Sequence, residues 1–152
     1  MSSTAEVMDK VRRLLVANDW RADLYGENGF RLPFEESDLF IEIEELTIGD
    51  GEAIHPIEVW TPVLFDVPVS DALARYVAAQ RFRFGNLRLH FDAEESIDTA
   101  KETLVAFEHT ILGDFLDAQE LEIALGMVFM SGTGEAEDMQ ARFGGTRPRD
   151  RA

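Results

Sequence analysis

The fold class of this chain follows from one stretch near its C-terminus, Asp117–Gly145, which reads DAQELEIALGMVFMSGTGEAEDMQARFGG. Asp117 followed by Glu120 is a capping-box pattern, in which each side chain satisfies backbone N–H groups that the first helical turn leaves unpaired. Apolar residues then recur at helical spacing from Leu121 to Phe129, and Gly144-Gly145 is a typical helix stop. The stretch therefore predicts one long amphipathic helix.

Alternating apolar residues just upstream predict a long strand over Thr103–Leu112. The other predicted elements are a helix from Ser3 to about Asn18, a hairpin at Asn28-Gly29, strands over 39–43 and 57–65, a helix from Ser70 to near Gly85, and a strand over 87–91. The order is α-β-β-β-(β)-α-β-β-α. Consecutive strands without intervening helices indicate an α+β fold, an antiparallel sheet with helices packed on one face.

Local sequence adds three expectations to this outline. Asn28-Gly29 favours a type I′ turn, because both residues tolerate positive φ. Pro56 and Pro62 have no N–H for a ladder, which favours an edge position for the strand over 57–65 and leaves open whether it pairs with the strand over 39–43. Gly132-Thr-Gly134 predicts a kink in the last helix, or a second short helix after it, since each glycine costs about 1 kcal/mol relative to alanine.

Composition places the chain among soluble cytoplasmic proteins with one domain. The chain has 152 residues, 45% of them hydrophobic, with eleven Phe and no cysteine, so we expect a single domain over 1–145 and a disordered tail over 146–152. No signal peptide or run of about 18 apolar residues is visible. The net charge of −16 opposes binding to nucleic acids and anionic membranes, and suits high solubility or a basic partner.

Motifs for catalysis, cofactors and metals are missing from the sequence, so we expect no catalytic, cofactor-binding or metal-binding residues. His55, His90 and His109 have no second ligand at metal spacing. The acidic runs, such as Glu42-Ile-Glu44-Glu45, are typical of solvated strand faces and loops. Gly132-Thr-Gly134 lies inside a helix pattern, which does not fit a dinucleotide-binding loop.

Apolar residues beyond those needed for one core indicate a partner surface. Phe40, Trp60 and Leu64 are candidates for a second apolar face of the sheet, and Met127 and Met130 lie off the main face of the last helix. Methionine suits adaptable contact surfaces, because its side chain is flexible and polarisable. We therefore expect these five residues to contact a peptide or a partner chain.

The element order, the stretch Leu116–Leu121 and the ending Met139–Gly145 resemble the YbjN family of putative bacterial sensory-transduction regulators. The resemblance implies a fold similar to class I type III secretion chaperones, often a homodimer, with peptide or protein binding as its inferred activity. It offers no catalytic residues. Gly132-Thr-Gly134 departs from relatives, in which the last helix tends to be unbroken.

We therefore expect a non-enzymatic, chaperone-like module that acts as a homodimer and binds a protein or peptide client. One alternative is a small-molecule-binding or enzymatic domain with a pocket between sheet and helices, for example with His90 or His109 beside a buried carboxylate. Another is a purely electrostatic partner for basic proteins, whose binding would weaken steeply with added salt.

Overall fold

The computed structural model describes residues 2–151 as an α+β fold. The helices are α1 (Thr4–Ala17), α2 (Asp71–Ala79) and α3 (Ala118–Phe143), with short 3₁₀ turns η1 (Gly113–Phe115) and η2 (Pro148–Asp150). The strands are β1 (Asp23–Tyr25), β2 (Gly29–Leu32), β3 (Leu39–Ile43), β4 (Leu46–Ile48), β5 (Glu52–Ile54), β6 (Pro56–Pro68), β7 (Asn86–His90) and β8 (Glu102–Leu112).

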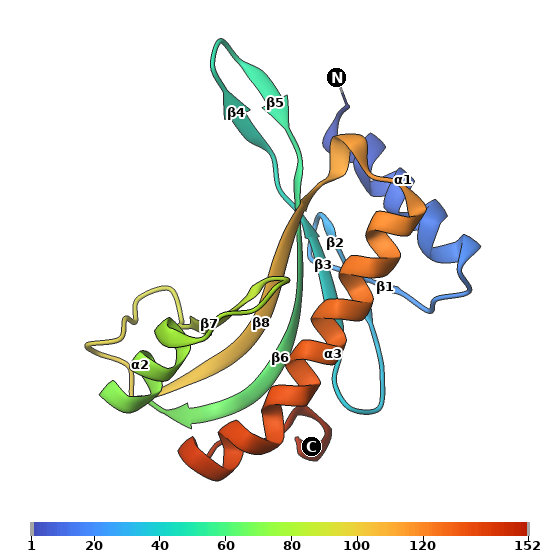
Figure 1. The fold of residues 1–152 in the computed structure, drawn as a ribbon. Helices are drawn as coiled ribbons and strands as arrows, with labels where there is room; N and C mark the ends of the chain where they lie inside the picture. Colours follow the sequence, from blue (N-terminus) through green and yellow to red (C-terminus); the bar gives the residue numbers. More distant parts are fainter. Residues whose placement is uncertain (1, 152) are drawn as a thin grey trace.

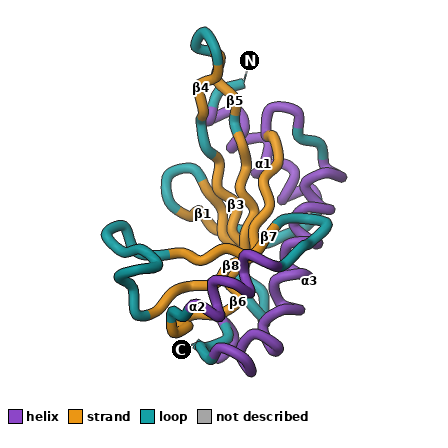
Figure 2. Tube along the Cα trace, turned by 60° about the vertical axis from the view of Figure 1, so that its left-hand side comes forward, coloured by secondary structure: helices purple, strands orange, loops and turns teal. Residues whose placement is uncertain are grey.

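Six of the strands form one antiparallel sheet in the order β1-β2-β3-β6-β8-β7. The helices α1 and α3 lie on the same side of this sheet (Figures 1 and 2). The core between them is filled by apolar side chains of both layers, among them Val11, Val59, Phe107 and Leu125. Strands β4 and β5 form a separate two-stranded hairpin that projects beyond the end of the sheet (Figure 1). We call residues 44–55 the arm.

Helix α3 confirms the capping prediction and shows why its glycines are tolerated. The side chain of Asp117 accepts a hydrogen bond from the Glu120 N–H at 2.7 Å. The helix runs unbroken through Gly132 and Gly134, so the expected second short helix is wrong. Gly132 is buried, and a Cβ there would lie 2.3 Å from Cγ2 of Thr61, so the missing side chain lets α3 approach β6 closely.

The prediction that the strand over 57–65 is an edge strand is wrong, because β6 lies inside the sheet between β3 and β8. The prolines are compatible with this position because β3 pairs with β6 only over Ile57–Trp60, and Pro56 and Pro62 lie outside that segment. The carbonyl oxygen of Pro56 still accepts a hydrogen bond from the Glu44 N–H. The strands over 39–43 and 57–65 therefore do pair.

Two boundaries differ from the sequence expectations. The hairpin of β1 and β2 exists, but Tyr25 pairs with Gly29, so the loop has three residues and the type I′ turn at Asn28-Gly29 is wrong. Helix α2 begins after Ser70 as predicted and ends at Ala79, six residues before Gly85.

The C-terminal segment also differs, because its described residues pack against the sheet. Thr146 exchanges two backbone hydrogen bonds with Phe65, and η2 follows it, where the sequence predicted a disordered tail over 146–152. Among the described residues, none of the helices combines the length and apolar character needed to cross a membrane.

Candidate functional site on the uncovered face of the sheet

The sheet face opposite the helices carries the strongest candidate site. In β6, Thr61 faces α3, where its Cγ2 lies against Gly132. Side chains alternate along a strand, so Glu58 and Trp60 point to the opposite face. No helix among residues 2–151 packs on that face (Figure 2). We call it the outer face.

Four rings from different strands form a row across the outer face. Phe40 of β3 stacks on Trp60 of β6, with ring centroids 4.3 Å apart and planes 15° apart. Tyr25 contacts Phe40 on one side at 4.7 Å, and His90 lies 5.9 Å from Trp60 on the other. We call Tyr25, Phe40, Trp60 and His90 the aromatic row. Tyr25 is 39% exposed, Trp60 and His90 are half-buried, and Phe40 is 9% exposed. A partly accessible row of rings on an uncovered sheet face is compatible with an interaction surface.

Carboxylates from three neighbouring strands lie beside the aromatic row. Glu42 of β3 accepts a hydrogen bond from Nε1 of Trp60 at 2.7 Å, and its Cα partner on β6 is Glu58. Glu108 of β8 pairs in the register with Trp60, which lies two residues from Glu58 on the same face. We call Glu42, Glu58 and Glu108 the carboxylate cluster.

Two β7 side chains contact Glu108, which is only 9% exposed. Nη1 of Arg88 lies 3.2 Å from Oε1 of Glu108, and Nε2 of His90 lies 3.5 Å from its Oε2. Nε2 of His90 and Oε2 of Glu108 are both buried, and neither atom has a hydrogen-bond partner among residues 2–151. The strand pairing therefore brings one arginine and one histidine against a buried carboxylate.

Burial and mutual repulsion separate the pKa values of the two inner carboxyls. Burial, followed by the hydrogen bond and charge of Glu108, raises the pKa of Glu58 to about 7. Burial also acts to raise the pKa of Glu108, but contacts with His90, Glu58 and Arg88 outweigh it and lower that pKa to about 2. The pair thus shares one proton near neutral pH, and Glu58 holds it.

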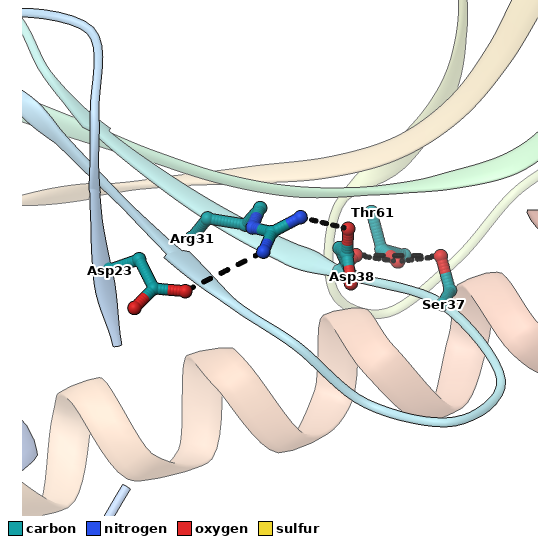
Figure 3. A network of polar contacts seen from close by, with 5 residues as sticks. All are labelled: Asp23, Arg31, Ser37, Asp38 and Thr61. Carbon is teal, nitrogen blue, oxygen red and sulfur yellow. Dashed lines mark hydrogen bonds and ion pairs between the residues drawn. The ribbon is translucent and has the colours of Figure 1, made fainter. Parts of the chain in front are cut away.

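A polar network holds the start of β3 against β6 and so positions Phe40 (Figure 3). Arg31 of β2 bridges Asp23 and Asp38 at 3.5 and 3.4 Å. The hydroxyl of Thr61 donates to the carbonyl oxygen of Asp38 at 2.8 Å, and its oxygen lies 3.1 Å from the hydroxyl oxygen of Ser37. Because β3 cannot slide along β6 without breaking these contacts, the network fixes the stacking of Phe40 on Trp60.

The five residues expected to contact a partner fall in three places. Phe40 and Trp60 meet on the outer face, as described above. Leu64 is fully buried in the core, which corrects the expectation that it shares a face with Trp60. The register of β6 against β8 shifts between Pro62 and Leu64, and this irregularity turns Leu64 toward the helices.

Met127 and Met130 lie on α3, away from the outer face. Met130 is 70% exposed, Met127 is half-buried and Ile123, one turn before Met127, is 45% exposed. Residues three and four apart share one side of a helix, so these three form a stripe. We call Ile123, Met127 and Met130 the α3 stripe. Near its N-terminal end a groove of about 570 Å³ is lined by Phe84, His109, Ile111 and Ile123, among others.

The histidines take roles that the sequence did not indicate. His55 is fully buried at the base of the arm, where its Nδ1 lies 3.0 Å from Oδ1 of Asp114 and its backbone N–H donates to Oδ2 at 2.7 Å. His90 does lie beside a buried carboxylate, but on the outer face and not between sheet and helices. Within residues 2–151, no three His, Cys, Asp or Glu side chains are grouped so that they could hold a metal ion.

Sequence reasoning missed Glu58, Arg88, His90 and Glu108 as a group. The alternation in each strand does place them on the wet face, but their neighbours depend on strand order. That order brings β7 beside β8 and β8 beside β6. The expectation that the acidic runs are solvated concerned only Glu42 of the carboxylate cluster, whereas Glu58 is half-buried and Glu108 is buried.

Comparison with known proteins gives no family for this chain. No protein-family model matches the sequence, and no curated protein matches it. The resemblance to the YbjN family therefore stays a prediction from the last helix and the element order.

Proposed function

We propose that this chain is a non-enzymatic, chaperone-like module that binds a peptide or protein segment and acts as a homodimer in the cytoplasm. The observation that carries the proposal is the outer face, where an aromatic row lies on a sheet surface without a covering helix. The few residues that dominate binding energy at protein interfaces are enriched in Trp and Tyr, which bury a large area at low entropic cost. The resemblance to the YbjN family supports the same class of function.

The shape of the outer face suits a polypeptide better than a small molecule. The aromatic row crosses the sheet from Tyr25 on β1 to His90 on β7. Small-molecule sites are concave and enclose most of the ligand, whereas the aromatic row runs along a sheet face, with a hollow of about 570 Å³ at its His90 end. An extended segment that lies along the strands can contact several rings at once.

The same geometry favours the α3 stripe for contact between two copies. Two outer faces placed against each other would bring the carboxylate clusters of both chains together, which costs free energy by like-charge repulsion. The α3 stripe has no charged member, and Met130 is its most exposed residue. We therefore assign the dimer contact to the α3 stripe and the client to the outer face.

Selection from a random peptide library displayed on phage tests the client site. Peptides enriched on the wild-type protein should lose at least tenfold in affinity on Trp60→Ala, since an interface aromatic truncated to alanine costs about 2 kcal/mol or more. Phe115→Ala is the matched control, because Phe115 is 80% exposed on η1 and belongs to neither surface. Enriched peptides that bind Trp60→Ala as tightly as wild type would refute the outer face as the client site.

Light scattering at tens of micromolar tests the dimer. The wild type should have twice the mass of one chain, and Met130→Glu should shift it to the monomer because it buries a charge in an apolar contact. Leu24→Glu, which changes an equally exposed residue on β1, should leave the dimer intact. A monomeric wild type would reject the homodimer and leave the client site standing.

A further inference from the structure

The outer face is strongly acidic. It carries the carboxylate cluster and also Glu44. The negative charge of Glu44 is one of the causes that raise the pKa of Arg88. Arg88 is the cation that acts on Glu58, and its guanidinium already pairs with Glu108 at 3.2 Å. A partner that covers this face must therefore bring positive charge, or leave carboxylates buried without a counter-ion, which costs several kcal/mol.

Other cations near this face already have partners, since Arg31 of β2, which pairs with Phe40 in the register, bridges Asp23 and Asp38. In the C-terminal segment, Arg147 donates to Gln140 at 2.9 Å and Arg149 pairs with Glu36 at 3.2 Å. The guanidinium of Arg151 lies 4.0 Å above the ring of Phe65. A second copy would bring the same net charge of −16, and phosphate-rich partners are repelled for the same reason. The occupant is then a basic polypeptide.

Resting on the function proposed above, we propose that the outer face receives an extended basic segment in which an apolar residue and a lysine or arginine are two positions apart. The spacing follows from β6, since Trp60 and Glu58 are two residues apart on one face. An extended segment has the same repeat of about 6.7 Å. An apolar side chain thus meets the aromatic row while the cation two positions on meets Glu58 and Glu42.

The arriving cation takes the place of the proton on Glu58. The charged groups that face Glu58 are Glu42 on β3, Glu108 on β8 and Arg88 on β7, with His90 against Glu108. A lysine or arginine beside Glu58 stabilises its ionised form and so releases the proton on binding. With the pKa of free Glu58 at about 7, affinity should fall about tenfold from pH 8 to pH 6 through this one proton.

Isothermal titration calorimetry on the full chain tests the inference with one peptide pair. The probe is the acetylated, amidated octapeptide Leu-Ser-Lys-Ser-Leu-Ser-Lys-Ser, and its control replaces both lysines by glutamate. The lysine peptide should bind at least tenfold more tightly than the glutamate peptide. Titration near pH 6.5 in buffers of different ionisation enthalpy should show release of about one proton. Glu58→Gln should abolish that release, and Glu137→Gln, on the exposed side of α3, should leave it unchanged.

The outcomes separate this inference from the proposed function. If both octapeptides bind equally, or if the lysine peptide binds without releasing a proton, the basic-segment inference is wrong. Peptides from the phage selection that depend on Trp60 and carry no lysine or arginine would also overturn it, while the proposed function would stand. If no selected peptide depends on Trp60, the proposed function fails and this inference fails with it.

Discussion

Replacing Glu58 by glutamine should stabilise the protein at alkaline pH and leave it unchanged at acid pH. Glutamine resembles the protonated carboxyl and keeps a donor for Glu108, but it has no charge to lose. The pKa of Glu58 rises from 4.5 in the unfolded chain to about 7 in the folded one. Its neutral form therefore contributes stability that is complete below pH 4.5 and is lost as the pH rises through 7.

The size of the effect follows from the shift. A rise from 4.5 to about 7 corresponds to about 3.4 kcal/mol, at about 1.4 kcal/mol per unit. Glu58 is only half-buried, so water screens its neighbours and reduces the effect to about 1–2 kcal/mol. Glu58→Gln should be more stable than wild type by that amount at about pH 8, and by less than about 0.5 kcal/mol at about pH 5.

Urea unfolding of wild type and variant at the two pH values measures this difference. Taking the difference between the two proteins cancels the pH dependence of every group that is not coupled to Glu58. Glu137→Gln controls for the loss of one surface charge, because Glu137 is exposed on α3. The account of the shared proton would be refuted if the variant were less stable than wild type at alkaline pH. It would also be refuted if the variant and wild type differed in free energy of unfolding by the same amount at both pH values.

Three further changes test the packing that positions the site. Gly132→Ala should destabilise by about 1–3 kcal/mol in urea, because its Cβ would lie 2.3 Å from Thr61. Gly134→Ala meets nothing within 4 Å and should stabilise by about 0.5–1 kcal/mol in the same assay, since alanine is the better helix former. Asp114→Ala should cost about 2–3 kcal/mol, because it leaves the buried His55 without its partner. Hydrogen exchange should then speed up first in the arm, and unchanged exchange there would contradict the role given to this pair.

The sequence was sufficient for elements that local chemistry determines. The predicted helices begin at Ser3, Ser70 and Asp117, and the side chain of each of these residues accepts a backbone hydrogen bond from the residue three positions on. The antiparallel sheet with helices on one face also follows from the order of elements. The helix caps depend on residues three apart, so one short stretch of chain is enough to predict each of them.

Features that depend on distant residues were missed. No local pattern shows that Gly132 is needed because Thr61 lies above it, some seventy residues away in the chain. A register shift in the pairing of β6 with β8 decides which face of the sheet Leu64 occupies. Alternation within β6 alone predicts the wrong face for it. The grouping of Glu58 with Glu108 likewise needs the strand order.

The same strand order brings the carboxyls of Glu58 and Glu108 together on the outer face, and their repulsion persists in the folded protein. Two carboxyls compete for one proton beside the aromatic row, and this arrangement lowers stability near and above neutral pH. Natural sequences are locally consistent except where function requires otherwise, and a bound cation would relieve this particular conflict. Replacing Glu58 should therefore strengthen the fold and weaken the binding of a basic segment together. A carboxyl with only a structural role would change stability and leave binding as it was.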